Sequence, residues 1–173
     1  ISQHSQRLRE MISSLLDINK FENNEMKIQK TPLDLVEMTK SILKCYQVNS
    51  KNVSINLKTD YDKLVKDLDK NKIERVIENL LTNAIKFSNE NDSIIVEIEK
   101  EKEAIIIKII DRGPGIPEDY QEKIFEKFGQ IQSRQAGRKY STGLGLTFCK
   151  FAVEAHDGQI GVYNNQTSGS TFW

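Results

Sequence analysis

The chain has 173 residues, of which 38% are hydrophobic and 29% are charged, and its 25 basic residues balance 25 acidic ones. This composition excludes disordered and collagen-like chains, and no apolar run reaches the ~20 residues that a membrane helix needs. Zero net charge without a long basic block argues against nucleic acid as the main partner.

The two cysteines and the two ends of the sequence indicate where the protein is located and whether the sequence is complete. Cys45 and Cys149 form no CxxC motif, so we expect reduced thiols and a cytoplasmic location. The first ten residues lack the apolar core of a signal peptide. Because the sequence begins without Met and stops at Trp173 within an apolar stretch, we expect a piece of a longer protein. Whether that parent is anchored in the inner membrane stays open.

The first residues predict a helix that belongs to a bundle. Apolar residues recur at alternating three- and four-residue spacings, which is typical of a seam between packed helices. The seam residues are Ile1, His4, Leu8, Met11, Leu15 and Ile18. Ile12 and Leu16 widen the stripe, and we expect no packing partner for this helix within the chain. The polar run 22–25 marks the predicted boundary between a bundle segment, 1–22, and a second domain, 23–173.

The next part of the chain predicts two strands and two helices. Alternation of apolar and polar residues indicates the strands, and helix-capping residues indicate the helices. The predicted elements are a strand at Met26–Lys30, a helix from Asp34 to about Val48, a strand at Val53–Leu57 and a helix at Lys70–Phe87. Asp34 and Glu37 form a capping box, and Asp69 is a candidate N-cap for the long helix.

The remainder of the chain mixes adjacent strands with a further helix. A short polar turn joins two β-rich runs, which predicts an antiparallel pair. The predicted elements are strands at Ser93–Glu99 and Ala104–Asp111, short helical pieces around Tyr120–Phe125, a helix at Leu144–His156, and strands at Gln159–Tyr163 and Ser170–Trp173. This order predicts an α+β fold, a two-layer sandwich with a mixed sheet covered on one face by helices.

The helix at Lys70–Phe87 carries two stripes of different character. Its apolar face comprises Ile73, Val76, Ile77, Leu80, Ala84 and Phe87. A polar stripe comprises Arg75, Asn79, Asn83 and Lys86. Asparagine is a mediocre helix former, so two asparagines one turn apart suggest a role other than helix formation. Their amide oxygens could hold Mg²⁺ with Lys86 meeting phosphate, or the stripe could simply be a solvated edge.

Two glycine turns are candidate ligand sites. Asp111-Arg112-Gly113-Pro114-Gly115 follows a strand, where Asp111 can accept from an exocyclic amine and the glycines allow close approach of a flat ligand. The alternative is an ordinary strand-end turn. Thr142–Leu146 opens a helix whose amides favour phosphate, although such a pattern is often only a helix entry. Between the turns, the segment 128–140 could be a lid or disordered, and its Arg134, Arg138 and Lys139 could touch phosphates.

Taken together and in this order, these segments resemble the catalytic ATP-binding domain of sensor histidine kinases. The matching segments are Asn79–Phe87 (asparagine box), Asp111–Gly115 (first glycine box), Ile124–Phe128 (phenylalanine box), Thr142–Leu146 (second glycine box) and Gly169–Phe172 (start of the final strand). Leu15–Glu22 resembles the end of the second helix of the dimerisation and phosphotransfer bundle. The resemblance covers essentially the whole chain and implies the Bergerat fold of gyrase, heat-shock chaperones and mismatch-repair ATPases, here with the final strand truncated.

The resemblance also implies ATP and Mg²⁺ as cofactors and gives each matching residue a role. Asn83 would bind Mg²⁺, Asn79 would lie beside it at the phosphates, and Lys86 would contact phosphate, which makes these three the catalytic set. Asp111 would recognise the adenine amino group, and Phe87 would line the nucleotide. The other implied cofactor-binding residues are Gly113, Gly115, Ile116, Arg138, Lys139, Thr142, Gly143, Leu144, Gly145, Leu146 and Thr171.

The implied reaction is transfer of the γ-phosphate to a histidine on a bundle helix, for relay to an aspartate of a response regulator. The implied partners are that regulator's receiver domain and the parent's own bundle, which would form a homodimer. Gyrase-type hydrolases carry a water-activating Glu where this chain has Asn79, so its absence fits transfer to a protein side chain. Glu78 points about 100° away around the helix and is a poor substitute. Ser141 replaces the usual first glycine of the second box.

The phosphoacceptor is expected outside this sequence. His4 is followed by Ser5 where the family motif has an acidic residue, and it lies at a seam position, so we expect the acceptor upstream of residue 1. We expect His156 to be a helix-end residue. Two alternatives stay open: a non-catalytic nucleotide-binding module that signals by conformation, and an anti-sigma-type serine kinase on the same fold, against which the bundle helix argues.

Overall fold

The computed structural model describes residues 3–49, 53–129 and 142–173. Its elements are, in chain order, α1 (Gln3–Glu22), β1 (Thr31–Asp34), α2 (Leu35–Asn49), β2 (Ser54–Lys58), β3 (Val65–Leu68), α3 (Lys70–Phe87), β4 (Ser93–Glu101), β5 (Ala104–Ile110), the short 3₁₀ helices η1 (Glu118–Tyr120) and η2 (Lys123–Phe125), α4 (Gly145–Glu154), β6 (Val162–Asn164) and β7 (Ser170–Phe172). In the described ranges, no helix is both long and apolar enough to cross a membrane.

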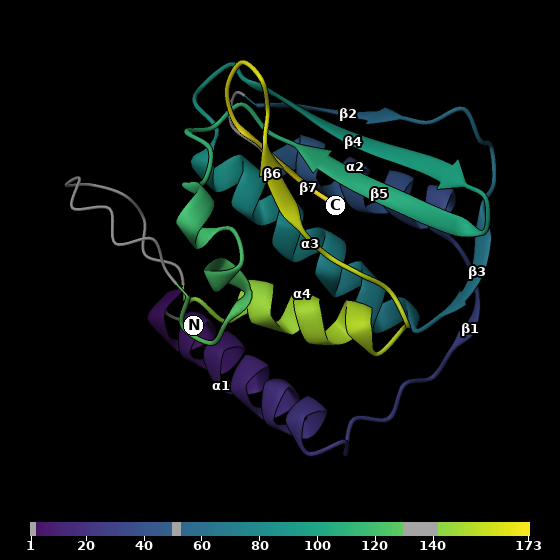
Figure 1. Cartoon of the computed structure of the whole chain (residues 1–173), viewed down its shortest axis with the longest axis vertical. Helices are drawn as coiled ribbons and strands as arrows, with labels where there is room; N and C mark the ends of the chain where they lie inside the picture. The colour runs from purple at the N-terminus through teal and green to yellow at the C-terminus, as the bar shows by residue number, and fades with distance from the viewer. Residues whose placement is uncertain (1–2, 50–52, 130–141) are drawn as a thin grey trace.

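Five strands form a mixed sheet in the order β2-β4-β5-β7-β6. β2 runs parallel to β4, and the other neighbours are antiparallel. The helices α2, α3 and α4 lie on one side of this sheet (Figure 1). The predicted α+β fold with a mixed sheet and helices on one face is therefore confirmed, as is the antiparallel pair β4–β5.

Near the start of the domain, one strand prediction was wrong and one strand was missed. The segment 26–30 is not a strand, because β1 begins only at Thr31, where it finds a pairing partner in Leu68. That partner strand, β3, was not predicted at all, because its sequence Val65-Lys66-Asp67-Leu68 does not alternate. The pair β1–β3 forms a separate two-stranded sheet.

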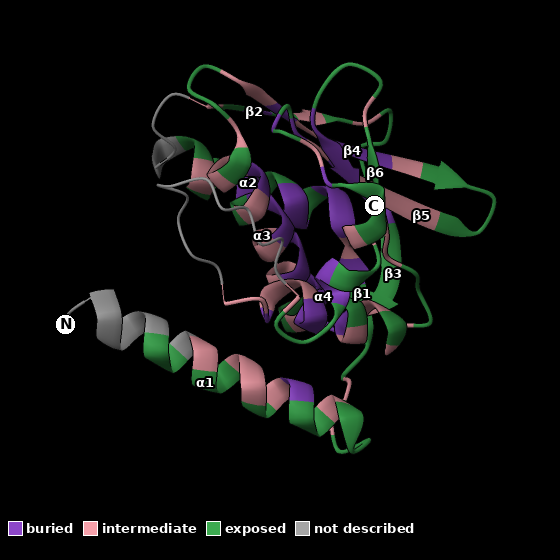
Figure 2. Cartoon of the chain, turned by 60° about the vertical axis from the view of Figure 1, so that its left-hand side comes forward, coloured by how far each residue is buried: buried purple, intermediate pink, exposed green. Residues whose placement is uncertain are grey.

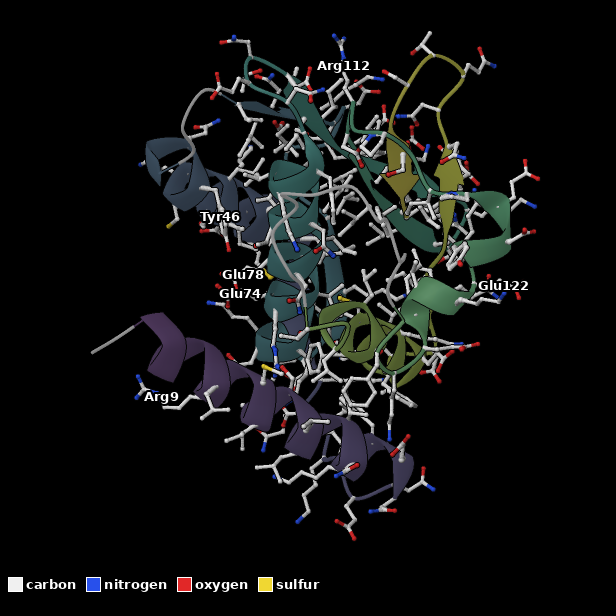
Figure 3. The ribbon with its side chains drawn as sticks, turned by 90° about the vertical axis from the view of Figure 1, so that its left-hand side faces the viewer. Arg9, Tyr46, Glu74, Glu78, Arg112 and Glu122 are labelled. Atoms are coloured by element: carbon white, nitrogen blue, oxygen red, sulfur yellow. The ribbon has the colours of Figure 1, made fainter. Side chains whose placement is uncertain are left out.

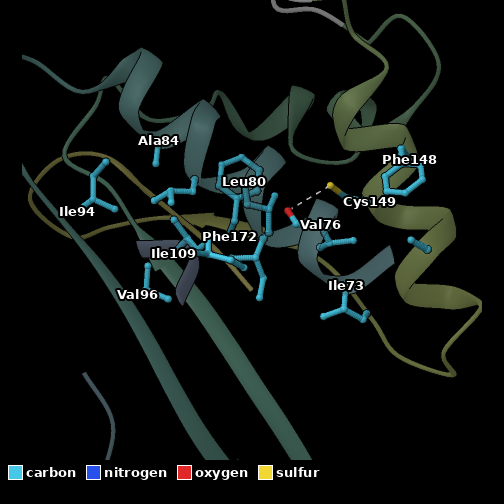
Figure 4. Close-up of a cluster of buried hydrophobic side chains, with 14 of the residues drawn as sticks. Ile73, Val76, Leu80, Ala84, Ile94, Val96, Ile109, Phe148, Cys149 and Phe172 are labelled. Atoms are coloured by element: carbon cyan, nitrogen blue, oxygen red, sulfur yellow. Dashed lines mark hydrogen bonds between the residues drawn. The ribbon is translucent and has the colours of Figure 1, made fainter. Parts of the chain in front are cut away.

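Helix α3 begins and ends at the predicted residues. The Asp69 carboxylate accepts a hydrogen bond from the backbone N–H of Lys72 at 3.2 Å, which caps the first turn. The buried residues of α3 are Ile73, Val76, Ile77, Leu80, Leu81 and Ala84. They pack between the sheet and α4, as Figure 4 shows. Phe87 was predicted on this apolar face but is 40% exposed, because it lies in the last turn at the edge of the core.

Helix α1 packs against the rest of the chain, contrary to the expectation that it has no partner here. Ile18 is fully buried in the main core cluster. The Phe21 ring lies 6.0 Å from Phe148 in an edge-on arrangement and is stacked 6.0 Å from Phe151, both on α4. The prediction failed because a seam in the sequence indicates packing but does not identify the partner. The division into domains 1–22 and 23–173 stays a prediction.

Polar contacts fix α1 to the start of α3 as well. The Arg75 guanidinium pairs with the Asp17 carboxylate, and its second nitrogen donates to Ser14 Oγ at 2.8 Å. The same guanidinium lies 3.9 Å from the Phe148 ring centroid. On the opposite side of α1, Leu8, Ile12 and Leu16 are about half exposed. Figure 2 shows that exposed segments recur along this helix.

Candidate functional site

Asp111 lies directly after β5, where its carboxylate is almost completely buried. Its Oδ1 accepts from the backbone N–H groups of Gly113 at 2.8 Å and Ser170 at 3.2 Å. Its Oδ2 accepts from Ser170 Oγ at 2.7 Å. Two carboxylate oxygens can accept about four hydrogen bonds, so these three donors fix the group and leave acceptor capacity on Oδ2. A ligand amine is the kind of donor that this position can take.

The turn that follows Asp111 lies against the end of α3. A Cβ at Gly113 would lie 2.9 Å from the carbonyl oxygen of Phe87, so only glycine fits this approach. Gly115 has a φ of +75°, and a Cβ there would lie 2.9 Å from Asn164 Oδ1. The backbone N–H of Ile116 donates to the same Asn164 oxygen at 2.8 Å. The predicted residues Phe87, Gly113, Gly115 and Ile116 are therefore brought together beside Asp111.

The second glycine turn lies against the middle of α3. A Cβ at Gly145, the first residue of α4, would lie 3.2 Å from Asn79 Oδ1. Gly143 has a φ of +70°, and the Leu144 N–H donates to Thr142 Oγ1 at 3.3 Å. Leu144 itself is fully buried, which anchors the turn. Asn79 of the predicted polar stripe thus lies against the N-terminus of α4, where the second glycine turn was predicted.

The phenylalanine-box segment closes on this second turn. The N–H of Phe128 donates to the Gly143 carbonyl at 3.2 Å. The Thr147 hydroxyl is within hydrogen-bond reach of the carbonyls of Glu126, at 2.9 Å, and Gly143, at 3.3 Å. Of the predicted lid residues, Arg134, Arg138 and Lys139 lie outside the described residues, as does Ser141.

The rest of the polar stripe remains accessible at the surface of α3. Asn79, Asn83 and Lys86 are all partly exposed. Lys86 Nζ lies 5.1 Å from the ring centroid of the exposed Phe87. One side of α3 therefore presents two amides, an ammonium and an aromatic ring between the two glycine turns. Leu146, one residue into α4, is also partly exposed.

Glu78 lies on a different side of α3 from Asn79. Thr82, one turn on, donates to the Glu78 carbonyl at 2.7 Å and lies 3.5 Å from the Tyr46 hydroxyl of α2. Figure 3 labels Glu78 on α3 and Tyr46 on the adjacent helix α2. Burial, with a smaller contribution from Glu74, raises the pKa of Glu78 above its usual value. This placement agrees with the expectation that Glu78 is a poor substitute for a water-activating Glu at position 79.

The residues of the site suit a hard cation better than a soft one. Among the described residues, no group of three His, Cys, Asp or Glu side chains could hold a metal ion. The Asn79 amide oxygen lies against the second glycine turn, 3.2 Å from where a Cβ of Gly145 would be. Mg²⁺ prefers oxygen ligands and keeps several waters, so one or two such donors can suffice beside a phosphate.

Three residues of the β6–β7 hairpin contact the site and were missed in the sequence. Ser170 holds the Asp111 carboxylate, Asn164 bonds to the Ile116 backbone, and Asn165 Nδ2 donates to the Asp111 carbonyl at 2.9 Å. The predicted residue Thr171 is buried, and its Oγ1 donates to Asn165 Oδ1 at 2.6 Å. Ser170 lies in the segment Gly169–Phe172 that resembles the final strand of the family, but no role was predicted for it. Asn164 and Asn165 lie between the two predicted strands, where the sequence indicated no role.

Comparisons with known proteins identify the family to which the chain belongs. Residues 68–173 match the family described as "Histidine kinase-, DNA gyrase B-, and HSP90-like ATPase". The chain is 33% identical over 172 residues to the sensor protein KdpD of Clostridium acetobutylicum, which covers 99% of the chain and 19% of that protein. The chain thus spans about a fifth of the length of this relative.

Two solved structures share this fold. The histidine kinase ThkA, solved in complex with the response regulator protein TrrA, superposes with a TM-score of 0.74 at 25% identity, covering 98% of this chain and 46% of ThkA. Full-length ShkA in complex with AMPPNP gives a TM-score of 0.81 at 20% identity, covering 96% of this chain and 35% of ShkA, which shows the fold. The chain therefore belongs to the histidine kinase-, DNA gyrase B- and HSP90-like ATPase family, as the catalytic ATP-binding domain of a sensor histidine kinase.

Proposed function

We propose that this domain binds Mg·ATP along the polar side of α3 and presents the γ-phosphate to a histidine of the bundle. The observation that carries the proposal is that α3 meets both glycine turns. Gly113 approaches the Phe87 carbonyl at one end, and Gly145 approaches the Asn79 amide near the middle. A nucleotide lying between the turns would have its base at the first and its phosphates at the second.

The base would be recognised by Asp111. Oδ2 has acceptor capacity left beside the hydroxyl of Ser170, so it can accept from the exocyclic amine of adenine. Phe87 would line the nucleotide, and the close approach of backbone at Gly113 and Gly115 would shape a slot for a flat ring. Ile116 and Thr171 would belong to the wall of this slot.

The phosphates would lie at the start of α4. The turn Thr142–Leu146 presents its glycines, Gly143 and Gly145, at a helix N-terminus, where backbone N–H groups favour phosphate. Asn83 would hold Mg²⁺ with Asn79 beside it, and Lys86 would contact phosphate. Arg138 and Lys139 would add positive charge from the segment between the boxes. The metal would neutralise phosphate charge and help to align the γ-phosphate.

Transfer, and not hydrolysis, would be the main reaction. Position 79 carries an amide that cannot take a proton from water, and Glu78 lies about 100° away from Asn79 around α3. The domain's own contribution would be positioning and charge neutralisation. The phosphoryl group would then pass from the acceptor histidine to a response regulator aspartate, with the parent acting as a homodimer through its bundle.

The acceptor would lie on a helix outside this sequence. The chain has two histidines. The backbone N–H of Asp69 donates to His156 Nε2 at 2.9 Å, so the neutral ring carries its proton on Nδ1, which donates to the Ala152 carbonyl at 2.7 Å. Both nitrogens of His156 are thus engaged. His4 lies on α1, and its side chain is outside the described part of the chain.

Labelling with γ-³²P-ATP tests this proposal. The isolated chain should gain no acid-labile, base-stable label, whereas the same chain supplied with the bundle helices of its parent should label a histidine of those helices. His4→Ala in the complete protein should leave labelling largely intact. Stoichiometric labelling of the isolated chain that is lost in His4→Ala would contradict the proposal and make His4 the acceptor.

A further inference from the structure

The β6–β7 hairpin contacts the backbone of the first glycine turn through two side-chain amides. Asn164 accepts from the Ile116 N–H at 2.8 Å and donates from Nδ2 to the Ile116 carbonyl at 2.8 Å. One side chain therefore satisfies both backbone groups of a residue in the turn, as a neighbouring strand would. Ile116 is the fifth residue after Asp111, so this contact fixes the far end of the turn.

The next residue, Asn165, fixes the near end. Its Nδ2 donates to the Asp111 carbonyl at 2.9 Å and to the Ser168 carbonyl at 3.2 Å, and its Oδ1 accepts from the Thr171 hydroxyl at 2.6 Å. The Asp111 N–H donates to the Ser170 carbonyl at 2.9 Å. Both backbone groups of Asp111 are thus bonded to the hairpin, so the backbone cannot rotate without breaking these bonds.

Fixing the backbone matters because the Asp111 carboxylate has little freedom of its own. Ser170 already holds both of its oxygens, so the direction of the remaining acceptor on Oδ2 follows the position of the main chain. A hydrogen bond weakens steeply when its angle falls below about 120°, so a small rotation of the turn would spoil recognition of an amine.

We propose that Asn164 and Asn165 are positioning residues for base recognition, which hold the Asp111–Ile116 turn so that Asp111 distinguishes adenine from guanine. The proposal rests on the proposed function of Asp111. It assigns to the hairpin a part in specificity, beyond holding the sheet edge together.

Two substitutions replace the donor of each amide by a carboxylate oxygen, which cannot donate and adds one negative charge. Asn165→Asp keeps an oxygen for Thr171 and loses the bond to the Asp111 carbonyl, and Asn164→Asp keeps the acceptor for the Ile116 N–H and loses the bond to its carbonyl. Val162→Ala is the matched control, because it truncates a partly buried side chain of β6 without touching either amide. Gln166 is exposed in the same hairpin, so Gln166→Ala is a control for the effect of any substitution in the hairpin.

Equilibrium titration of each protein with ATP and with GTP, in Mg²⁺, tests the proposal, with thermal unfolding measured in parallel. A net hydrogen bond corresponds to about a threefold to tenfold change, so each Asn→Asp variant should lower the ratio of ATP to GTP affinity by about that factor. Val162→Ala should lower the unfolding temperature and keep the ratio, and Gln166→Ala should change neither. If one Asn→Asp variant fails to fold, the other decides.

The outcomes separate this inference from the function on which it rests. A wild-type chain with no preference for ATP over GTP would contradict the role of Asp111. A wild-type preference that both Asn→Asp variants retain, or an equal loss of affinity for both nucleotides, would overturn the positioning role alone.

Discussion

Truncating Ile18 tests whether α1 packs on the domain as the structure has it. Ile18 is fully buried, and Leu16, on the same helix, is 55% exposed. Removing buried methyl groups costs their transfer free energy and leaves a cavity, so Ile18→Ala should lower the free energy of unfolding by about 2–5 kcal/mol. Leu16→Ala should change it by less than about 0.5 kcal/mol, because an exposed leucine and an alanine are both good helix formers.

Urea denaturation at 25 °C, followed by far-UV circular dichroism and by the fluorescence of Trp173, measures both effects. Trp173 follows β7 and reports on the sheet, so a loss of helical signal before the fluorescence change would show that α1 detaches first. Whether α1 detaches first or the chain unfolds in one step, the loss of helical signal in Ile18→Ala should occur at a lower urea concentration than in the wild-type chain. Equal midpoints for Ile18→Ala and Leu16→Ala would refute the packing of α1 described above.

Three further outcomes follow from the core and the site. Burial raises the pKa of the Cys149 thiol to about 12, so at pH 8 an alkylating reagent should modify the exposed Cys45 quickly and Cys149 only after unfolding. Since the unfolded thiol ionises near 9.0, its contribution to stability should be lost as the pH rises from about 9 toward 12. Rapid modification of two thiols in the native chain would contradict this burial. Asn83→Ala should remove the Mg²⁺ dependence of ATP affinity, measured by calorimetry with Mg²⁺ and with a chelator, whereas Thr82→Ala on the neighbouring exposed position should keep it. An unchanged metal dependence in Asn83→Ala would show that this amide does not bind the metal.

Elements with a strong period of their own were predictable from the sequence. Helix α3 has an apolar face at the helical period and an N-cap, and the strands β4 and β5 are runs rich in β-branched residues joined by a short polar turn. Strand β3 was missed because it is short and mostly exposed, so no pattern of burial marks it. The segment 26–30 alternates, but it pairs with no strand in the part of the chain that the structure describes, and a strand needs a partner.

Candidate site residues could be singled out from the sequence where the residue type indicates a possible ligand. The amides of α3, the carboxylate at the strand end and the glycine turns each indicated a ligand, and the structure brings described members of each group together. The hairpin residues were not predictable, because Asn164 and Asn165 act through contacts with residues about 50 positions earlier. Such contacts depend on the fold, which the local sequence does not reveal. The packing of α1 was missed for the same reason.

The most direct measurement is a calorimetric titration of this chain with ATP and with GTP in the presence of Mg²⁺. The carboxylate of Asp111 would accept from the amine of adenine but would face the carbonyl of guanine, a mismatch worth about 1–3 kcal/mol. We expect a preference for ATP of about tenfold or more, and its loss in Asp111→Ala when circular dichroism shows that the variant is folded. Superimposable ATP and GTP curves for the wild-type chain would contradict base recognition by Asp111 and the nucleotide site built around it.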